Sequence, residues 1–192
     1  MTQTTDLKTA NAEAEQNRQQ TEQKAKKRKS PMHYPQLFLF HALVVILVVW
    51  LLFGVFFGVT TAPNDDMSPR IDGGDMLLYY RLDRDVQAQD VVVLNKNDTT
   101  YVSRVVAVGG DTVDITDNQS LVINGNHVVE DKIFYKTAKY QDYMSYPITL
   151  AEGECFVLDD KRQSGEDSRY FGTVKESEIL GTVITVLRKN NL

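Results

Sequence analysis

The sequence predicts an all-β, largely antiparallel domain outside the membrane, preceded by one N-terminal transmembrane helix. Three observations support this prediction: a charge-free apolar run near the N-terminus, a basic cluster just before it, and a series of short β-branched segments after it. The 192 residues suffice for one domain with accessory segments. We divide the chain into a polar and basic cytoplasmic tail over residues 1–34, a transmembrane helix over residues 35–60 and a β domain over residues 61–192.

The apolar run over residues 42–59 has the sequence ALVVILVVWLLFGVFFGV and carries no charge. About 20 apolar residues span a bilayer as a helix. The basic cluster KAKKRKS, residues 24–30, precedes it, and such clusters stay on the cytoplasmic side. We therefore expect a single-pass protein of the cell membrane with a cytoplasmic N-terminus and an extracytoplasmic C-terminal domain. A cleaved signal peptide is the weaker alternative, because about 35 residues precede the run and the run itself is too long.

Beyond Pro63, the apolar residues come in short β-branched runs rather than at helical spacing. Asn124-Gly125 between two such runs predicts a hairpin, because both residues tolerate the positive φ angles of a tight turn. Residues 131–150 contain five aromatic residues without clear periodicity, which leaves open whether they form an excursion or a cap. The strand-like segments are residues 76–82, 90–95, 100–108, 111–115, 120–130, 154–160 and 181–187.

Charge and cysteine content exclude several classes of partner and site. Residues 1–62 have a net charge of +3 and residues 63–192 of −8, so the acidic main domain argues against nucleic acid. The single cysteine, Cys155, excludes an internal disulfide, and its apolar neighbours predict a buried thiol. No cluster of Cys and His suggests zinc, and we expect neither a metal nor a cofactor.

Four segments, in chain order, resemble sequence boxes of the type I signal peptidases. Asp66-Met67-Ser68-Pro69 resembles the Ser-Met-x-Pro box that follows the membrane anchor, and residues 74–78, GDMLL, resemble the Gly-Asp-apolar strand. Residues 101–111, YVSRVVAVGGD, are similar to Tyr-Val-Lys-Arg-Val-x-Gly-x-Pro-Gly-Asp. Residues 159–172, DDKRQSGEDSRYFG, are similar to Gly-Asp-Asn-Arg-x-x-Ser-x-Asp-Ser-Arg-x-x-Gly. The resemblance spans residues 35–188 and implies a signal-peptidase-like β fold.

In that family, a serine hydroxyl attacks the carbonyl of the signal peptide, and a desolvated, unprotonated lysine is the general base. The resemblance places Asp66 at the serine position and Ser103 at the lysine position. Gly165 stands where the family has a serine that helps to orient the lysine. Asp167 and Arg169 match the remaining pattern, so we expect their ion pair to brace the site. The resemblance therefore implies no catalytic residue at these positions.

We consider three ways in which these residues could still cleave a peptide bond, and each is chemically unfavourable. Attack by the Asp66 carboxylate on an amide would give an anhydride, with no obvious acid for the leaving amine. Asp65 and Asp66 do not converge as an aspartic dyad, because neighbours in an extended strand face opposite sides. Near its reference pKa of about 3.9, Asp66 is a feeble base towards the hydroxyl of Ser103 or Ser68. We therefore predict that Asp66 and Ser103 form a hydrogen-bonded polar pair in a semi-buried groove.

The remaining titratable candidates are expected on solvated faces. His127 lies on the predicted hairpin, where a surface imidazole is favoured over a catalytic triad. Six lysines that could approach Asp66 in space lie off the family's lysine position: Lys96, Lys132, Lys136, Lys139, Lys161 and Lys175.

Signal-peptidase-like proteins that lack both the serine and the lysine occur in Gram-positive bacteria, where they are assembly factors for sortase-built pili. The double replacement resembles these proteins. It implies a membrane-anchored chaperone or scaffold whose partners are pilin subunits or their signal peptides, with a sortase nearby. A peptidase cleft can hold an extended peptide without cutting it. The predicted cleft residues are Asp66, Met67, Ser68, Pro69, Ser103 and Arg104.

Two alternatives remain open from the sequence. The first is an active type I signal peptidase with a rewired site, and the second is a regulator that competes with an active signal peptidase for precursors. The aromatic residues of 131–150 are an alternative partner surface.

Overall fold

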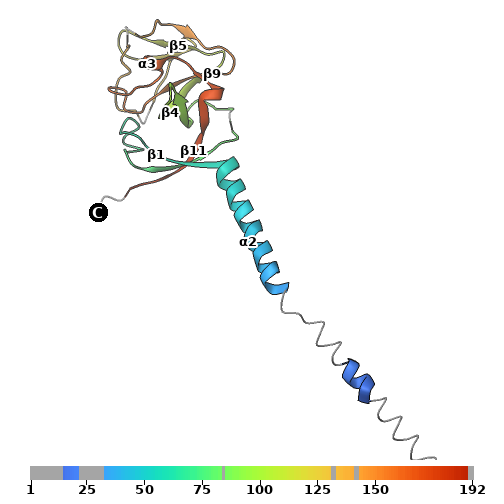
Figure 1. The fold of residues 1–192 in the computed structure, drawn as a ribbon. Helices are drawn as coiled ribbons and strands as arrows, with labels where there is room; N and C mark the ends of the chain where they lie inside the picture. Colours follow the sequence, from blue (N-terminus) through green and yellow to red (C-terminus); the bar gives the residue numbers. More distant parts are fainter. Residues whose placement is uncertain (1–14, 22–32, 84, 131–132, 141–142, 190–192) are drawn as a thin grey trace, which may run out of the picture. The chain divides into compact units, whose positions relative to one another are not determined.

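The computed structural model describes residues 15–21, 33–83, 85–130, 133–140 and 143–189 (Figure 1). The chain divides into two units, Met1–Val48 and Val49–Leu192. Most of the predicted tail over residues 1–34 lies outside the described residues, and residues 15–21 within it are helical.

The apolar run forms helix α2, His33–Leu51, followed by one π-helical turn, η1, Leu52–Phe56. An 18-residue stretch within Tyr34–Phe56 has a mean hydropathy of 2.8 and contains no buried residue, so this helix is long and apolar enough to cross a membrane. The expected helix over residues 35–60 is too long at its end. Residues Phe57–Thr61 instead form strand β1, because they pair in antiparallel register with a strand of the β domain.

The β domain contains a seven-stranded sheet with the strand order β1-β2-β11-β3-β4-β9-β10. Every pairing in it is antiparallel. Its remaining strands are β2 Met76–Tyr80, β3 Val91–Lys96, β4 Thr99–Val108, β9 Glu154–Leu158, β10 Val174–Lys175 and β11 Ile179–Leu187.

A smaller four-stranded sheet has the order β7-β6-β5-β8 and is also antiparallel. The predicted hairpin is confirmed: β6 pairs with β7, and Asn124 and Gly125 between them have φ angles of 52° and 78°. The strands of this smaller sheet are β5 Thr112–Ile115, β6 Leu121–Ile123, β7 Asn126–His127 and β8 Ile148–Thr149. Each predicted strand segment contains a strand. Short helices α3, Ser168–Phe171, and η2, Glu176–Glu178, make the all-β label approximate.

Strand β4 lies at the centre of the apolar core. Its six residues from 102 to 107 are all buried, so both of its faces are covered. Val105 packs in one apolar cluster, Val106 and Ala107 in a second and Val102 in a third. A polar residue on this strand therefore enters the interior and needs a polar partner there. Ser103 and its neighbour Arg104 are the two polar residues in this buried stretch.

Candidate functional site

The register of β4 and β9 determines what Ser103 contacts. Arg104 on β4 lies opposite Leu158 on β9, so residue 159, one step further, faces Ser103. The Ser103 hydroxyl donates a hydrogen bond to Asp159 Oδ1 at 2.6 Å, and Ser103 is 0% exposed. The predicted Asp66–Ser103 pair is therefore wrong, because the hydroxyl is used by a cross-strand carboxyl.

Asp66 lies in a turn beyond β1 and is half-buried. Its carboxylate accepts a hydrogen bond from Asn64 Nδ2 at 2.5 Å, and its backbone carbonyl accepts from the Lys161 amide at 2.8 Å. Burial is the main cause that raises the pKa of Asp66, and the positive charge of Lys161 opposes it. Among the six lysines considered from the sequence, Lys161 thus acts electrostatically on Asp66.

Two other lysines of that set are engaged elsewhere. Lys96 is not on a solvated face: it is largely buried, forms a 2.8 Å salt bridge with Glu178 and donates to the Thr173 carbonyl. Lys139 pairs with exposed Asp117 at 2.9 Å. Lys132 lies outside the described residues, and His127 is exposed, as predicted.

The other predicted cleft residues divide by exposure. Met67 is buried in the third apolar cluster, where its sulfur accepts a hydrogen bond from the Asp160 amide at 3.4 Å. Ser68 is half-buried and donates its hydroxyl hydrogen bond to Asp72 at 2.5 Å. Pro69 is exposed and Arg104 is buried. Of the six predicted contact residues, only Asp66, Ser68 and Pro69 therefore offer surface to a partner in this conformation.

Two buried ion pairs flank the Ser103–Asp159 contact. Arg104 forms a bidentate pair with Asp160, with distances of 2.7 Å from Nε to Oδ1 and 2.6 Å from Nη2 to Oδ2. Arg169 forms a second bidentate pair with Asp167, at 2.8 Å and 2.7 Å. The two sequence-matched residues Asp167 and Arg169 thus lie together, with both side chains fully buried. Such planar pairs fix orientation because each makes two parallel hydrogen bonds.

Asp159 is the polar residue of the site that sequence reasoning missed. In the described part of the chain it has no salt bridge, and its backbone amide donates to Asp167 Oδ2 at 3.1 Å. Burial raises its pKa well above the ordinary value, and the nearby Asp167 carboxylate raises it further. A signal was present in the sequence, because Asp159 stands where the resembling family box begins with glycine.

Glu130 and residues 133–140 cover the loop that follows β9, which bears on whether residues 131–150 form an excursion or a cap. Buried Arg162 donates to Glu130 at 2.6 Å and to Thr137 at 3.3 Å. The Tyr140 hydroxyl donates to the Gly165 carbonyl at 3.3 Å, and the Arg169 guanidinium lies 4.3 Å from the centre of the Tyr140 ring. Glu130 and residues 133–140 therefore form a cap over the buried network, whereas Ile148–Thr149 further along the segment form strand β8.

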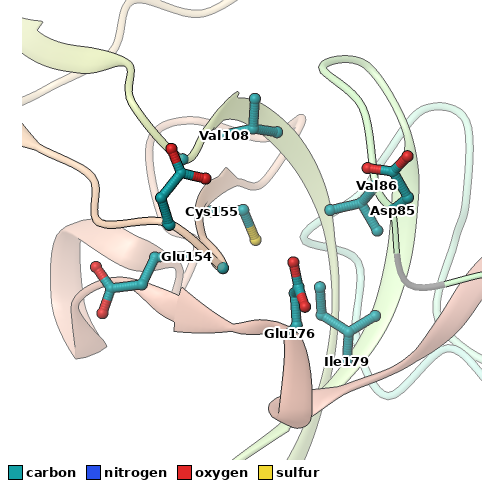
Figure 2. Close-up of a pocket in the computed structure, with 10 residues that line it drawn as sticks. Asp85, Val86, Val108, Glu154, Cys155, Glu176 and Ile179 are labelled. Carbon is teal, nitrogen blue, oxygen red and sulfur yellow. The ribbon is translucent and has the colours of Figure 1, made fainter.

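The structure also contains a shallow cavity of about 160 Å³ that includes none of the predicted site residues (Figure 2). Carboxylates lie around the cavity and Cys155 lies on its apolar wall. Burial raises the pKa of this thiol to about 12. Within the described residues, no group of three or more His, Cys, Asp or Glu side chains is placed to hold a metal ion. The acidic members of the lining are Asp85, Glu152, Glu154 and Glu176, and the apolar members include Val86, Val108 and Ile179.

The site thus combines a half-buried carboxyl, a buried hydroxyl bonded to a second carboxyl, and two buried ion pairs. Acyl transfer requires a nucleophile that reaches the carbonyl and a base within hydrogen-bond reach of it. Ser103 has no exposed surface, so its hydroxyl does not meet a peptide carbonyl in this conformation. What remains accessible is the turn that carries Asp66, Ser68 and Pro69.

Comparison with known proteins gives the family. The sequence profile of the family described as "Signal peptidase, peptidase S26" matches residues 36–187. Signal peptidase I of Bacillus caldolyticus is 33% identical over 131 residues, which are 61% of this chain and 71% of that protein. Signal peptidase I S of Bacillus subtilis (strain 168) is 30% identical over 154 residues, 73% of this chain and 83% of that protein.

Among solved structures, a signal peptidase I from Enterococcus faecalis V583 is 30% identical and covers 52% of this chain and 97% of that chain, with a TM-score of 0.42. The profile match extends from the apolar helix to the end of β11, across all four sequence boxes. The chain therefore belongs to the signal peptidase family, peptidase S26.

Proposed function

We propose that this protein is a non-catalytic member of the signal peptidase family that holds peptides without cutting them. The observation that carries the proposal is the pair of residues at the family's nucleophile and base positions. Asp66 replaces the serine, and Ser103, buried and hydrogen-bonded to Asp159, replaces the lysine. A carboxyl and a sequestered hydroxyl do not supply the nucleophile and neutral base that amide cleavage needs.

Peptide binding is supported by the position of β1. This strand is one edge of the seven-stranded sheet and ends shortly before Asp66. Edge strands present unpaired backbone groups, which can pair with an added extended peptide. The half-exposed Asp66 turn lies directly after this edge in the chain, so it is available to contact such a peptide's side chains.

The partner that we propose is pilin, or its signal peptide, in sortase-dependent pilus assembly. Support comes from the resemblance to the inactive pilus-associated members, which lack the same two groups. The apolar helix α2 and the family together indicate a membrane anchor. We propose that it is a single-pass anchor with the β domain outside the membrane, because the basic cluster precedes the helix. A chaperone or scaffold in that position would meet pilin as it emerges from the membrane.

A second candidate is an active signal peptidase with a rewired site. Family membership favours it, as do the names of the curated relatives. One local feature fits it as well, because the Lys161 charge acts on the Asp66 carboxyl. In this alternative, wild-type protein releases a signal peptide and Asp66→Ala abolishes the release.

A cleavage assay in detergent separates the two candidates. The substrate is a pre-pilin that carries its signal peptide, and an active signal peptidase is the positive control. We expect no cleavage by wild-type protein, and cleavage that depends on Asp66 would overturn the proposal.

A binding assay with the same pre-pilin tests the proposed surface. We expect Asp66→Arg, which reverses the charge of the accessible turn, to weaken binding at least tenfold. Asp117→Arg is the matched control, because Asp117 is 96% exposed and lies between strands of the other sheet. Equal binding by wild type and Asp66→Arg would place the partner surface elsewhere, with the cap formed by Glu130 and residues 133–140 as the next candidate.

A further inference from the structure

Ser103, Asp159 and Gly165 lie next to one another in the interior, with Asp159 between the other two. The Asp159 carboxyl accepts the Ser103 hydrogen bond through Oδ1. Its other oxygen lies against the backbone of Gly165, which is buried. A Cβ atom added at Gly165 would fall 2.6 Å from Asp159 Cβ and 2.8 Å from Asp159 Cγ, closer than real Cβ atoms approach. The Asp159 side chain therefore fills the gap between β4 and the loop that contains Gly165.

The sizes of the three side chains are complementary. A short serine lies on one side of Asp159 and a residue without a side chain lies on the other. The resembling family boxes have the opposite distribution, with lysine and serine at positions 103 and 165 and glycine at position 159. At position 159 this chain thus has a larger residue than the glycine of the family box. At positions 103 and 165, which Asp159 contacts, it has smaller residues than the lysine and serine of the family boxes.

We infer that Asp159 closes this site: its carboxyl occupies the volume that a lysine at position 103 and a serine at position 165 would require. The inference rests on the proposed function, since it explains how the absence of catalysis is built into the fold. Restoring lysine at position 103 and serine at position 165 would not by itself reopen the site. A Cβ atom at position 165 falls 2.6 Å from Asp159 Cβ, and the Asp159 carboxyl lies 2.6 Å from the side-chain oxygen at position 103. Asp159 is a packing residue in this proposal and has no catalytic role.

The surrounding contacts prevent Asp159 from moving aside easily. Its backbone amide is held by Asp167, and Asp167 is held in turn by Arg169. Arg169 also donates to the Arg162 carbonyl at 2.7 Å. With the backbone fixed in this way, a larger residue at position 165 must displace the Asp159 side chain within a packed interior.

Thermal unfolding of two full-length variants in detergent tests the inference. We expect Gly165→Ser to melt well below wild type because of the collision. The double variant Gly165→Ser/Asp159→Gly should melt at least about 5 °C above Gly165→Ser, since removal of the Asp159 side chain relieves the collision. Gly165→Ser/Asp117→Gly is the control, and it should show no recovery because Asp117 is exposed in the turn between β5 and β6. A double variant that melts at or below Gly165→Ser overturns the inference.

A graded variant and a cleavage assay sharpen the test. Asp159→Ala should rescue Gly165→Ser less than Asp159→Gly does, because the alanine Cβ keeps the 2.6 Å collision. The variant Asp66→Ser/Ser103→Lys/Gly165→Ser should remain inactive towards pre-pilin, and cleavage by it would also overturn the inference. Cleavage by wild-type protein would instead overturn the proposed function, whatever the melting temperatures, so the two failures are distinguishable.

Discussion

The Arg104 guanidinium and the Asp160 carboxylate meet in a planar, two-bonded arrangement inside the β domain, at 2.7 Å and 2.6 Å. Arg104 lies on β4 and Asp160 lies just beyond β9. Ser103 and Asp159 directly precede Arg104 and Asp160 in the chain. The ion pair and the Ser103–Asp159 hydrogen bond therefore both hold β4 to the residues that follow β9, and we call this contact the β4–β9 junction. The geometry of the site is thus held by a charged pair that offers no surface to a substrate.

We predict that Arg104→Met destabilises the protein by about 3–5 kcal/mol, because it leaves the buried Asp160 carboxylate without its cation. Urea unfolding of the full-length protein in detergent measures this loss. Lys139→Met is the control, since its partner Asp117 is exposed to solvent and such a pair contributes only about 0–1 kcal/mol. Similar losses for the two variants would mean that the buried pair does not stabilise this junction.

The strands were predictable from the sequence, but two features of the site were not. Alternating and β-branched runs, with Asn124-Gly125 between two of them, specify local structure without knowledge of the fold. In contrast, β1 has apolar residues that continue the membrane run without a break, and only its pairing with β2 separates strand from helix. For Asp159, the sequence shows only that an aspartate replaces the family's glycine. Because two aspartates are adjacent there, the strand register decides which one faces Ser103.

Asp159 should make the stability of the protein depend on pH. Burial first, and then the charges of Asp167 and Asp66, raise its pKa in the folded state, whereas Arg169 and the Ser103 hydrogen bond oppose the rise. The folded protein therefore binds this proton more tightly than the unfolded chain. The resulting stabilisation is fully present below the ordinary pKa of 3.8 and is lost as the pH rises through the raised value.

We predict that Asp159→Asn raises the melting temperature at pH 8 more than at pH 5. The amide keeps the size of the side chain and an acceptor for Ser103, but it cannot ionise. Within the titration window the advantage of the variant should grow by about 1.4 kcal/mol per pH unit. Asp117→Asn is the control, because it changes an exposed carboxylate. An equal effect of Asp159→Asn at both pH values would show that Asp159 does not carry this pH dependence.

Gly58 should be required for β1 to pair with β2. Gly58 lies opposite Tyr79, and an added Cβ would fall 2.5 Å from the Tyr79 hydroxyl oxygen and 2.6 Å from a ring carbon. Gly58→Ala should therefore lower the free energy of unfolding by about 1–3 kcal/mol. Val59→Ala on the same strand is the control, with an expected loss below about 1 kcal/mol because Val59 is exposed. Equal losses would mean that the Tyr79 ring moves freely away from the added methyl group.

Cys155 should be unreactive in the folded protein, although it lies on the wall of the cavity. The thiolate is the reactive form, and with a pKa of about 12 only about one thiol in ten thousand ionises at pH 8. We therefore expect negligible alkylation of wild-type protein by iodoacetamide at pH 8, and complete alkylation in guanidinium chloride. Because the chain has a single cysteine, mass spectrometry gives the modified fraction directly. Glu152→Cys in a Cys155→Ser background is the matched control, since the exposed position 152 should react within minutes. Rapid labelling of native wild-type protein would mean that this part of the core opens to solvent, and that the seal around Cys155 is weaker than its burial indicates.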